Sequence, residues 1–294
     1  DVIKNNIIQT IYNLEEAKVF SQKAILMNKD LTIHIKIDTG MNRLGMQDNN
    51  ETIDSILEIN KLDSLIIEGI FTHFAKADES DKEFTIEQVK TFTKIVKKLE
   101  EKDLIIPIKH VSNSAAIIDL PQFNMDMVRA GIMLYGLYPS EYVNHNNVKL
   151  KEVMTLKAKI SQVKTISKGQ GVSYGLKYKC SKDTQVATLP IGYADGFTRM
   201  LSGKASVMVK GAKSAIIGNI CMDQCIIEVT GLDVKIGDEV VLFGGNDSNG
   251  ISIDSVSDLL GTINYEIVCM VNKRVPRVYR FQKENEIIEK IKSL

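Results

Sequence analysis

The chain carries three short, unusual segments in its second half: Gly-Val-Ser-Tyr-Gly (171–175), Leu-Pro-Ile-Gly-Tyr-Ala-Asp-Gly (189–196) and Ile-Cys-Met-Asp-Gln (220–224). Two of them place a tyrosine beside a glycine, at Tyr174 and Tyr193, which predicts a phenol carried on a turn. The first half adds two more, Lys-Ile-Asp-Thr-Gly-Met-Asn-Arg-Leu-Gly (36–45) and Arg-Ala-Gly-Ile-Met-Leu-Tyr-Gly (129–136). These five segments contain most of the side chains that could carry chemistry.

Length and charge narrow the class of protein. The 294 residues predict one large or two medium domains, and 44% apolar residues are enough for a substantial core. Basic and acidic residues number 37 each, so the chain has no excess of positive charge of the kind that favours binding to nucleic acid or to an anionic membrane. The apolar runs are short and interrupted by charges, so no transmembrane helix is expected. The opening Asp-Val-Ile-Lys has neither an initiator Met nor a secretory segment, which predicts an N-terminally truncated chain.

Cysteine and histidine spacing gives no sign of a metal site. The four cysteines, Cys180, Cys221, Cys225 and Cys269, lack the two-residue spacing of a zinc knuckle. The apolar surroundings of Cys221 and Cys225 favour buried thiols, as expected in a reducing cytoplasm. The four histidines are scattered without paired-ligand spacing. We therefore expect a cytoplasmic protein without a metal.

The first half alternates short apolar runs with helical patterns. Candidate strands are Ile7–Tyr12, Leu31–Ile37, Leu65–Thr72, Pro107–Val111 and Met127–Ile132. Apolar residues at three- and four-residue steps predict helices at Leu14–Met27, Glu51–Asn60 and Phe84–Leu99. Such repetition predicts parallel strands joined by crossover helices. A (β/α)₈ barrel needs eight strands and about 250 residues, so we predict a partial TIM-type barrel whose first three or so strands are missing.

After about residue 150 the pattern changes to an alternation of apolar and polar residues. It occurs at Met154–Ile166, Ala205–Val209 and Ile226–Val229, and predicts an antiparallel, barrel-like β domain. Helical patterns follow at Asp254–Leu260, Tyr265–Val271 and, as a surface helix, Lys283–Leu294. Tyr138-Pro139 and the polar run Asn144–Asn147 mark the junction. The predicted domains are therefore residues 1–148, a barrel domain, and residues 149–294, the β-rich domain.

Polar side chains follow several of the predicted strands. His73 ends one strand, Asn113 and Ser114 follow the next, and Arg129 precedes Ala130-Gly131. Functional groups of a parallel barrel collect beyond the C-terminal ends of its strands. Each residue alone also fits a turn cap or a core histidine, but their joint placement favours a shared site. The N–H groups around Gly131 are candidates for holding a phosphate, although a lone glycine also fits a simple bend.

Taken together, these segments resemble alanine racemase, a pyridoxal 5′-phosphate enzyme, over essentially the whole chain. The resemblance implies that Arg129 faces the pyridine nitrogen of the cofactor and that His73 supports it. A guanidinium stays protonated near neutrality, so the ring nitrogen opposite it would remain unprotonated. The residues that the resemblance assigns to the cofactor phosphate are Ser114, Gly131, Ile132 and Tyr265.

The resemblance also implies a catalytic base. Tyr174 would remove the α-proton of L-alanine from one face, which requires its pKa to fall below the ordinary value near 10. It would reach the site from the partner subunit of a homodimer. The implied substrate-binding residues are Arg43, Tyr193 and Met222, with Asp223 near the pocket. Asp78 and Arg199 match residues along the substrate entry, but both also fit a solvated surface.

Lys36 and Asn42 lie in the segment that carries Arg43. Lys36 matches a lysine that is often carbamylated, whose negative charge orients the substrate-binding arginine; an unmodified lysine at a strand end remains the alternative. Asn42 stands where a glycine is usual. Because asparagine tolerates the left-handed conformation, we expect this loop to keep its shape.

The opposite-face base of the family is a lysine in a segment resembling Val-Lys-Ala-Asn-Ala-Tyr-Gly-His-Gly, and the 294 residues contain no such segment. This chain alone is therefore predicted to be inactive. Its parent would interconvert L- and D-alanine and supply D-alanine for peptidoglycan. Two alternatives remain: a serine or broad-spectrum amino-acid racemase, decided around Tyr193 and Met222, and a non-catalytic cofactor-binding relic.

Overall fold

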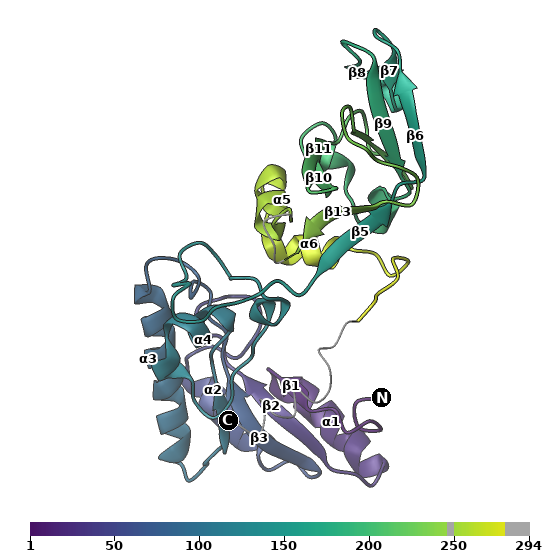
Figure 1. Cartoon of the computed structure of the whole chain (residues 1–294). Helices are drawn as coiled ribbons and strands as arrows, with labels where there is room; N and C mark the ends of the chain where they lie inside the picture. Colours follow the sequence, from purple (N-terminus) through teal and green to yellow (C-terminus); the bar gives the residue numbers. More distant parts are fainter. Residues whose placement is uncertain (246–249, 280–294) are drawn as a thin grey trace, which may run out of the picture. The chain divides into compact units, whose positions relative to one another are not determined.

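The computed structural model describes residues 1–245 and 250–279 and divides the chain into two compact units, Asp1–Lys151 and Glu152–Leu294 (Figure 1). The main elements of the first unit are β1 (Gln9–Ile11), α1 (Leu14–Leu26), β2 (Leu31–Lys36), α2 (Asn50–Ile59), β3 (Leu65–Phe71), α3 (Glu83–Glu100), β4 (Ile108–His110) and α4 (Ser114–Asp119). The predicted strand–helix repetition is confirmed, and each long helix lies within two residues of its predicted bounds.

The first unit is built on a parallel sheet. Its strand order is β1-β2-β3-β4, and every neighbouring pair is parallel. Three helices of this unit begin where an asparagine side chain accepts a backbone N–H: Asn13 caps α1, Asn49 caps α2 and Asn113 caps α4, whereas α3 begins without such a cap. The C-terminal ends of β2, β3 and β4 therefore lie at one edge of the sheet, where the polar residues follow.

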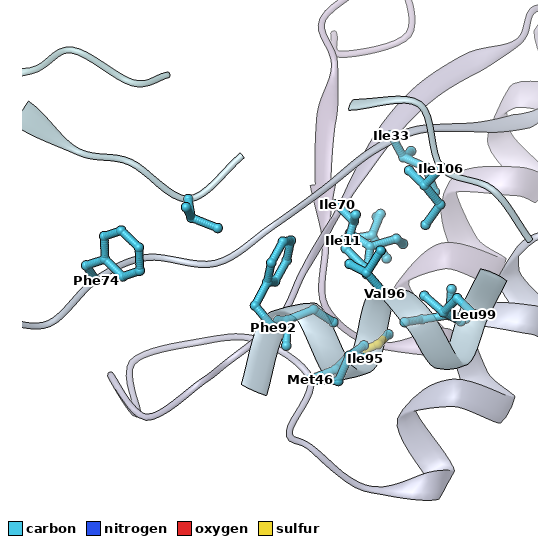
Figure 2. Packing of buried hydrophobic residues seen from close by; sticks show 14 of the residues in the cluster. Ile11, Ile33, Met46, Ile70, Phe74, Phe92, Ile95, Val96, Leu99 and Ile106 are labelled. Carbon is cyan, nitrogen blue, oxygen red and sulfur yellow. The ribbon is translucent and has the colours of Figure 1, made fainter. Parts of the chain in front are cut away.

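A single apolar cluster fills the space between this sheet and its helices. In α3, Phe92, Ile95, Val96 and Leu99 recur at the spacing of one helix face and are all buried. Figure 2 shows them packed near Ile11, Ile33 and Ile70 from the strands. Fully burying a side chain of this size is worth roughly 1.5–3 kcal/mol. The cluster thus holds the strand ends in fixed positions.

The predicted fifth strand, Met127–Ile132, is wrong. Its backbone follows the end of β4 through two hydrogen bonds, from Asp126 N to Lys109 O and from Arg129 N to Ser112 O, both 3.0 Å. No ladder forms, and the chain turns at Gly131 into a short 3-10 helix, η2 (Ile132–Tyr135). Met127 and Val128 remain exposed, so burial does not favour a strand here. The described sheet has four strands rather than five, and it is not in itself a barrel.

The second unit is antiparallel, as predicted. Its strands form three sheets, of order β11-β10-β13-β5, β12-β9-β6 and β7-β8. The elements are β5 (Thr155–Lys159), β6 (Gln162–Ile166), β7 (Gly171–Val172), β8 (Tyr178–Lys179), β9 (Thr184–Leu189), β10 (Ser206–Val209), β11 (Ala212–Ala215), β12 (Cys225–Glu228), β13 (Glu239–Gly244), α5 (Ile253–Leu260) and α6 (Asn264–Met270). The two helices confirm the predicted patterns, while Lys283–Leu294 lies outside the described residues.

Within residues 1–245 and 250–279, no helix is both long and apolar enough to cross a lipid bilayer.

Candidate active site

The ends of β2, β3 and β4 bring together a group of basic side chains in the first unit. Lys36 is the last residue of β2, His73 follows β3, and His110 is the last residue of β4. Arg129 reaches this edge from the segment after α4 and contacts both histidines. Arg129 and His73, both predicted as site residues, therefore lie in contact.

Backbone carbonyls hold the Arg129 guanidinium. Its Nη2 donates to Thr72 O at 2.8 Å and to Val111 O at 3.1 Å, while Nη1 donates to His110 O at 3.2 Å. The guanidinium carbon also lies 5.2 Å from the centre of the Phe71 ring. Burial lowers the pKa of Arg129 to about 10, so the group is still protonated near neutrality. The result is a fixed positive charge at the strand ends.

The two histidines beside Arg129 are neutral at pH 7. Burial, reinforced by the Arg129 charge, lowers the pKa of His73 to about 4 and that of His110 to about 3. Arg129 Nη2 lies 3.3 Å from His73 Nδ1, and Nη1 contacts His110 Nδ1. Because a guanidinium only donates, both Nδ1 atoms face it as acceptors.

Lys36 is buried, and its amine titrates near physiological pH. Burial lowers its pKa to about 8; Asp38 opposes this shift, whereas Arg129 and Arg43 add to it. Its Nζ donates to Ile37 O at 2.7 Å and lies 5.6 Å from the centre of the Phe71 ring. A buried amine with such a pKa is partly deprotonated at pH 8 and can act as a nucleophile.

Arg43 lies on the loop that follows β2. The Asp38 side chain holds this loop through hydrogen bonds to its backbone. The Asp38 carboxylate accepts the N–H of Gly40 at 2.9 Å and of Asn42 at 3.0 Å. Asn42 has φ +56°, so the predicted left-handed conformation is confirmed. The Arg43 residue is exposed. Asp78, predicted at the substrate entry, is half-buried on the loop after β3, where its carbonyl accepts the Ser140 hydroxyl.

Three of the predicted phosphate-binding residues lie together. The buried Ser114 Oγ accepts the N–H of Gly131 at 2.8 Å and of Met133 at 3.4 Å. Ile132 begins η2 immediately afterwards. A β-carbon at Gly131 would lie 3.6 Å from Ser114 Oγ, an ordinary van der Waals contact. The fourth residue, Tyr265, lies in α6 of the second unit.

The second unit has a pocket of its own, with a volume of about 470 Å³. Its lining combines two phenols with polar and sulfur-bearing side chains: Tyr174, Tyr193, Arg199, Cys221, Met222, Asp223 and Gln224. Five of these seven were predicted as catalytic, substrate-binding, pocket or entry residues. Segments 171–175, 189–196 and 220–224 therefore line one pocket, in which Tyr174 is 70% exposed.

The turn that carries Tyr174 is strained. Ser173 has φ +61° and ψ −173°, a region that is essentially restricted to glycine and costs about 1–3 kcal/mol for other residues. The Ser173 hydroxyl donates to Asn219 O at 2.5 Å, and the Asn219 amide donates to Tyr174 O at 2.6 Å. These bonds oppose the strain and fix the backbone at Tyr174, which is in a 3-10 turn as predicted.

Tyr193 is fixed by the neighbouring Cys221–Met222 loop. Tyr193 N donates to Cys221 O at 3.1 Å, and Ala194 N donates to Met222 O at 3.0 Å. A β-carbon at Gly192 would lie 2.2 Å from Cys221 O, so only glycine permits this approach. Arg199 donates from Nη1 to Ile220 O at 3.2 Å. The two loops therefore form one wall of the pocket.

Three residues at these sites could not be predicted from the sequence: His110, His34 and Arg274. His34 and His110 are hydrogen-bonded although 76 positions separate them, so spacing along the chain could not pair them. Each lies inside a predicted strand, His34 at the middle of Leu31–Ile37 and His110 next to the end of Pro107–Val111, and no motif marked either of them. Arg274 lies beyond α6 and contacts Asp195 and Asp223; no motif marked it.

Comparison with known proteins adds a further finding. The family models described as "Alanine racemase, N-terminal domain" and "Alanine racemase, C-terminal domain" match residues 1–139 and 153–279. An alanine racemase of Clostridium perfringens (strain SM101 / Type A) is 49% identical over 292 residues, which cover 98% of this chain and 75% of the relative.

Solved structures give the same result. Alanine racemase of Clostridium difficile 630 matches with a TM-score of 0.91 and 46% identity, covering 95% of this chain and 72% of the other. Alanine racemase from Bartonella henselae with covalently bound pyridoxal phosphate matches with a TM-score of 0.80 and 29% identity, covering 95% and 75%.

Proposed function

This chain belongs to the alanine racemase family of isomerases, and we propose that its residues serve the interconversion of L- and D-alanine with pyridoxal 5′-phosphate. Its fold is that of the family, a barrel-type N-terminal domain followed by a β-rich C-terminal domain. One observation carries the proposal for the site: a buried, protonated Arg129 fixed by three carbonyls beside the neutral His73 and His110.

The residues of the first unit suit this cofactor. The Ser114 hydroxyl proton and the N–H of Ile132 are donors that a phosphate needs. The N–H of Gly131, which donates to Ser114 Oγ here, would turn to the phosphate on binding, and Tyr265 would add a phenol. Arg129 would face the ring nitrogen and, by staying charged, would keep that nitrogen unprotonated. His73 would support the ring. When bound, pyridoxal phosphate supplies the electron sink that makes the α-hydrogen of an amino acid acidic.

Tyr174 is the proposed base for L-alanine. Racemisation removes the α-proton from one face and returns a proton to the other, so two opposed acid–base groups are required. The exposed Tyr174 phenol opens into a pocket whose other phenol is Tyr193. We propose that the second unit offers this pocket to a partner subunit of a homodimer. Tyr193 and Met222 would then contact substrate, with Asp78 and Arg199 along the entry.

Arg43 is the proposed partner of the substrate carboxylate, and Lys36 would orient it. The neutral Lys36 amine would add to CO₂, forming a nitrogen–carbon bond and releasing a proton, to give a negatively charged carbamate. The pKa of about 8 supports this, because a neutral amine is needed. A carbamate near the Arg43 loop would attract the guanidinium and hold it toward the substrate.

The base for D-alanine is not among these residues. No segment of the 294 residues resembles the one that carries the family's cofactor-binding lysine. We therefore propose that a polypeptide limited to these residues is inactive as a racemase. Racemisation needs that lysine in addition, and the D-alanine formed would serve peptidoglycan synthesis.

The test is a racemase assay on the protein as its native gene encodes it, with pyridoxal 5′-phosphate. Loss of deuterium from 2-deuterated L-alanine measures the Tyr174 step. Tyr174→Phe should slow it by about 10²–10⁴-fold, the usual contribution of one acid–base group. Tyr178→Phe, a nearby phenol outside the pocket, is the matched control and should keep wild-type exchange. No racemisation by the wild type, or full exchange in Tyr174→Phe, would overturn the proposal.

A further inference from the structure

Behind Arg129 a line of hydrogen bonds runs across three strands. Arg129 Nη1 contacts His110 Nδ1, His110 Nε2 lies 2.9 Å from His34 Nδ1, and His34 Nε2 lies 3.1 Å from Glu68 Oε2. Both histidines are buried, with relative exposures of 7% for His34 and 2% for His110. The Glu68 side chain is 37% exposed. The line thus connects a buried cation to a carboxylate near solvent.

The chemistry of the two ends gives this line a single direction. A guanidinium only donates, so His110 Nδ1 must accept and the proton of the neutral ring sits on Nε2. That N–H donates to His34 Nδ1, which leaves the proton of neutral His34 on Nε2. An ionised carboxylate only accepts, so Glu68 receives this last N–H. Every bond has one donor and one acceptor, and both tautomers are determined.

Two features of the backbone make room for this arrangement. Ile33 pairs with Ile67, but His34 pairs with Gly69, so Glu68 is an extra residue in β3. Such a bulge re-aims a side chain, and here the Glu68 carboxylate meets the ring of His34. A β-carbon at Gly69 would lie 2.5 Å from the His34 ring. Only glycine leaves room for the imidazole at this point of β3.

We propose that His34 and Glu68 are positioning residues that fix the tautomer of His110 and thereby the orientation of Arg129. In the opposite tautomer, His110 Nδ1–H would point at the N–H of Arg129, and two donors would oppose each other. The guanidinium would then leave its carbonyl partners at Thr72 and Val111. The consequence for a bound cofactor rests on the proposed function, whereas the tautomers themselves do not.

The direct test is histidine-selective ¹⁵N labelling and long-range ¹H–¹⁵N NMR of the full chain without cofactor. Single substitutions of the four histidines in these 294 residues assign their signals. We expect His34 and His110 both to be protonated at Nε2 and not at Nδ1. Protonation at Nδ1 of either ring would overturn the proposal, whether or not the protein racemises alanine.

Substitutions then separate positioning from general stability. Glu68→Gln keeps an acceptor oxygen and should retain both tautomers. Glu68→Ala removes the acceptor at a half-exposed position, so it should fold while His34 shows a mixture of tautomers. At metal sites, loss of the outer partner of a ligating histidine typically costs about 10–100-fold in affinity or activity, and we take the lower end as the guide here. In the protein as its native gene encodes it, we expect Glu68→Ala to lower kcat about tenfold with little change in KM, because Glu68 lies at the solvent-accessible end.

The controls keep a failure of this inference apart from a failure of the proposed function. His145→Phe alters an exposed histidine outside the line and should match the wild type in kcat. Wild-type tautomers and wild-type kcat in Glu68→Ala would overturn the positioning role of Glu68. If the wild type itself proves inactive, the proposed function fails, and the NMR signals of the Arg129 guanidinium still report the inference: they should broaden in Glu68→Ala and stay sharp in Glu68→Gln.

Discussion

Arg274 Nε lies 2.7 Å from Asp195 Oδ1, and this contact joins the segment after α6 to the turn that carries Tyr193. The other oxygen of the same carboxylate accepts Gly192 N at 2.8 Å, while Arg274 Nη2 lies 2.5 Å from Asp223 Oδ1. One guanidinium therefore bridges the two loops that line the Tyr174 pocket. Its planar fork suits two carboxylates better than an ammonium does.

Arg274→Lys should disturb this pocket more than it disturbs the fold. Arg274 is half-exposed, so the ion pairs themselves add little stability. A lysine cannot reach both carboxylates in the same geometry, and the Asp223 loop should loosen. We expect a several-fold rise in KM for alanine with an unchanged melting temperature. Lys273→Ala is the control. An unchanged KM in Arg274→Lys would show that the bridge does not shape the pocket.

Ser173 offers a clean measure of stored backbone strain. Ser173→Ala and Ser173→Gly both lose the hydroxyl bond to Asn219 O, but only glycine occupies φ +61°, ψ −173° without strain. The glycine variant should therefore be more stable than the alanine variant by about 1–3 kcal/mol. Urea unfolding of the pair measures this difference directly. Equal stabilities would mean that the turn relaxes around residue 173.

Carbamylation of Lys36 can be observed without any assay of activity. The protein equilibrated with ¹³C-bicarbonate at pH 8 should give a carbamate signal in its ¹³C spectrum, because the pKa of Lys36 is about 8. Lys36→Gln should abolish the signal, and Lys168→Gln, which alters an exposed lysine, should keep it. A signal that survives in Lys36→Gln would assign the modification to another amine.

Acid should destabilise the first unit through His73. Its pKa falls from the ordinary 6.5 to about 4 because burial and Arg129 disfavour the charged ring. Between these values the unfolded chain binds more protons than the folded one, so the free energy of unfolding decreases as the pH falls from 6.5 to 4. His73→Gln should remove up to about 3 kcal/mol of this loss.

The measurement is urea unfolding at several pH values between 4 and 7. His145→Gln controls for the loss of a histidine outside the cluster. A pH dependence of His73→Gln as steep as that of the wild type would show that other groups carry the acid sensitivity.

The helices and three of the strand ends could be predicted because their signals are local. In α3 the apolar residues repeat at the helix period, and the buried strands β2 and β3 are apolar runs between polar loops. Met127–Ile132 has the same apolar character, yet its residues only follow the end of β4. An apolar run becomes a strand only if a partner strand pairs with it, and the sequence of the run does not specify that partner.

Site residues could be predicted where they share one segment of the sequence. Contacts between residues of different strands could not be predicted. Tyr174 beside Gly175 indicated a turn, but nothing in the sequence indicated that Ser173 carries the strain. His34 and His110 meet because β2 and β4 flank β3, and their contact depends on the shift in register at Glu68. Register is a property of paired strands, so it cannot be read from one of them.

The extra residue in β3 also sets a trade-off for redesign. Deleting one residue there would restore regular pairing with β2, which by ordinary criteria is an improvement to the sheet. The same deletion would turn the following side chains to the opposite face, and the carboxylate of Glu68 would no longer meet His34. In this protein a more regular sheet and a connected pair of histidines exclude each other, so an idealised backbone would be the poorer scaffold.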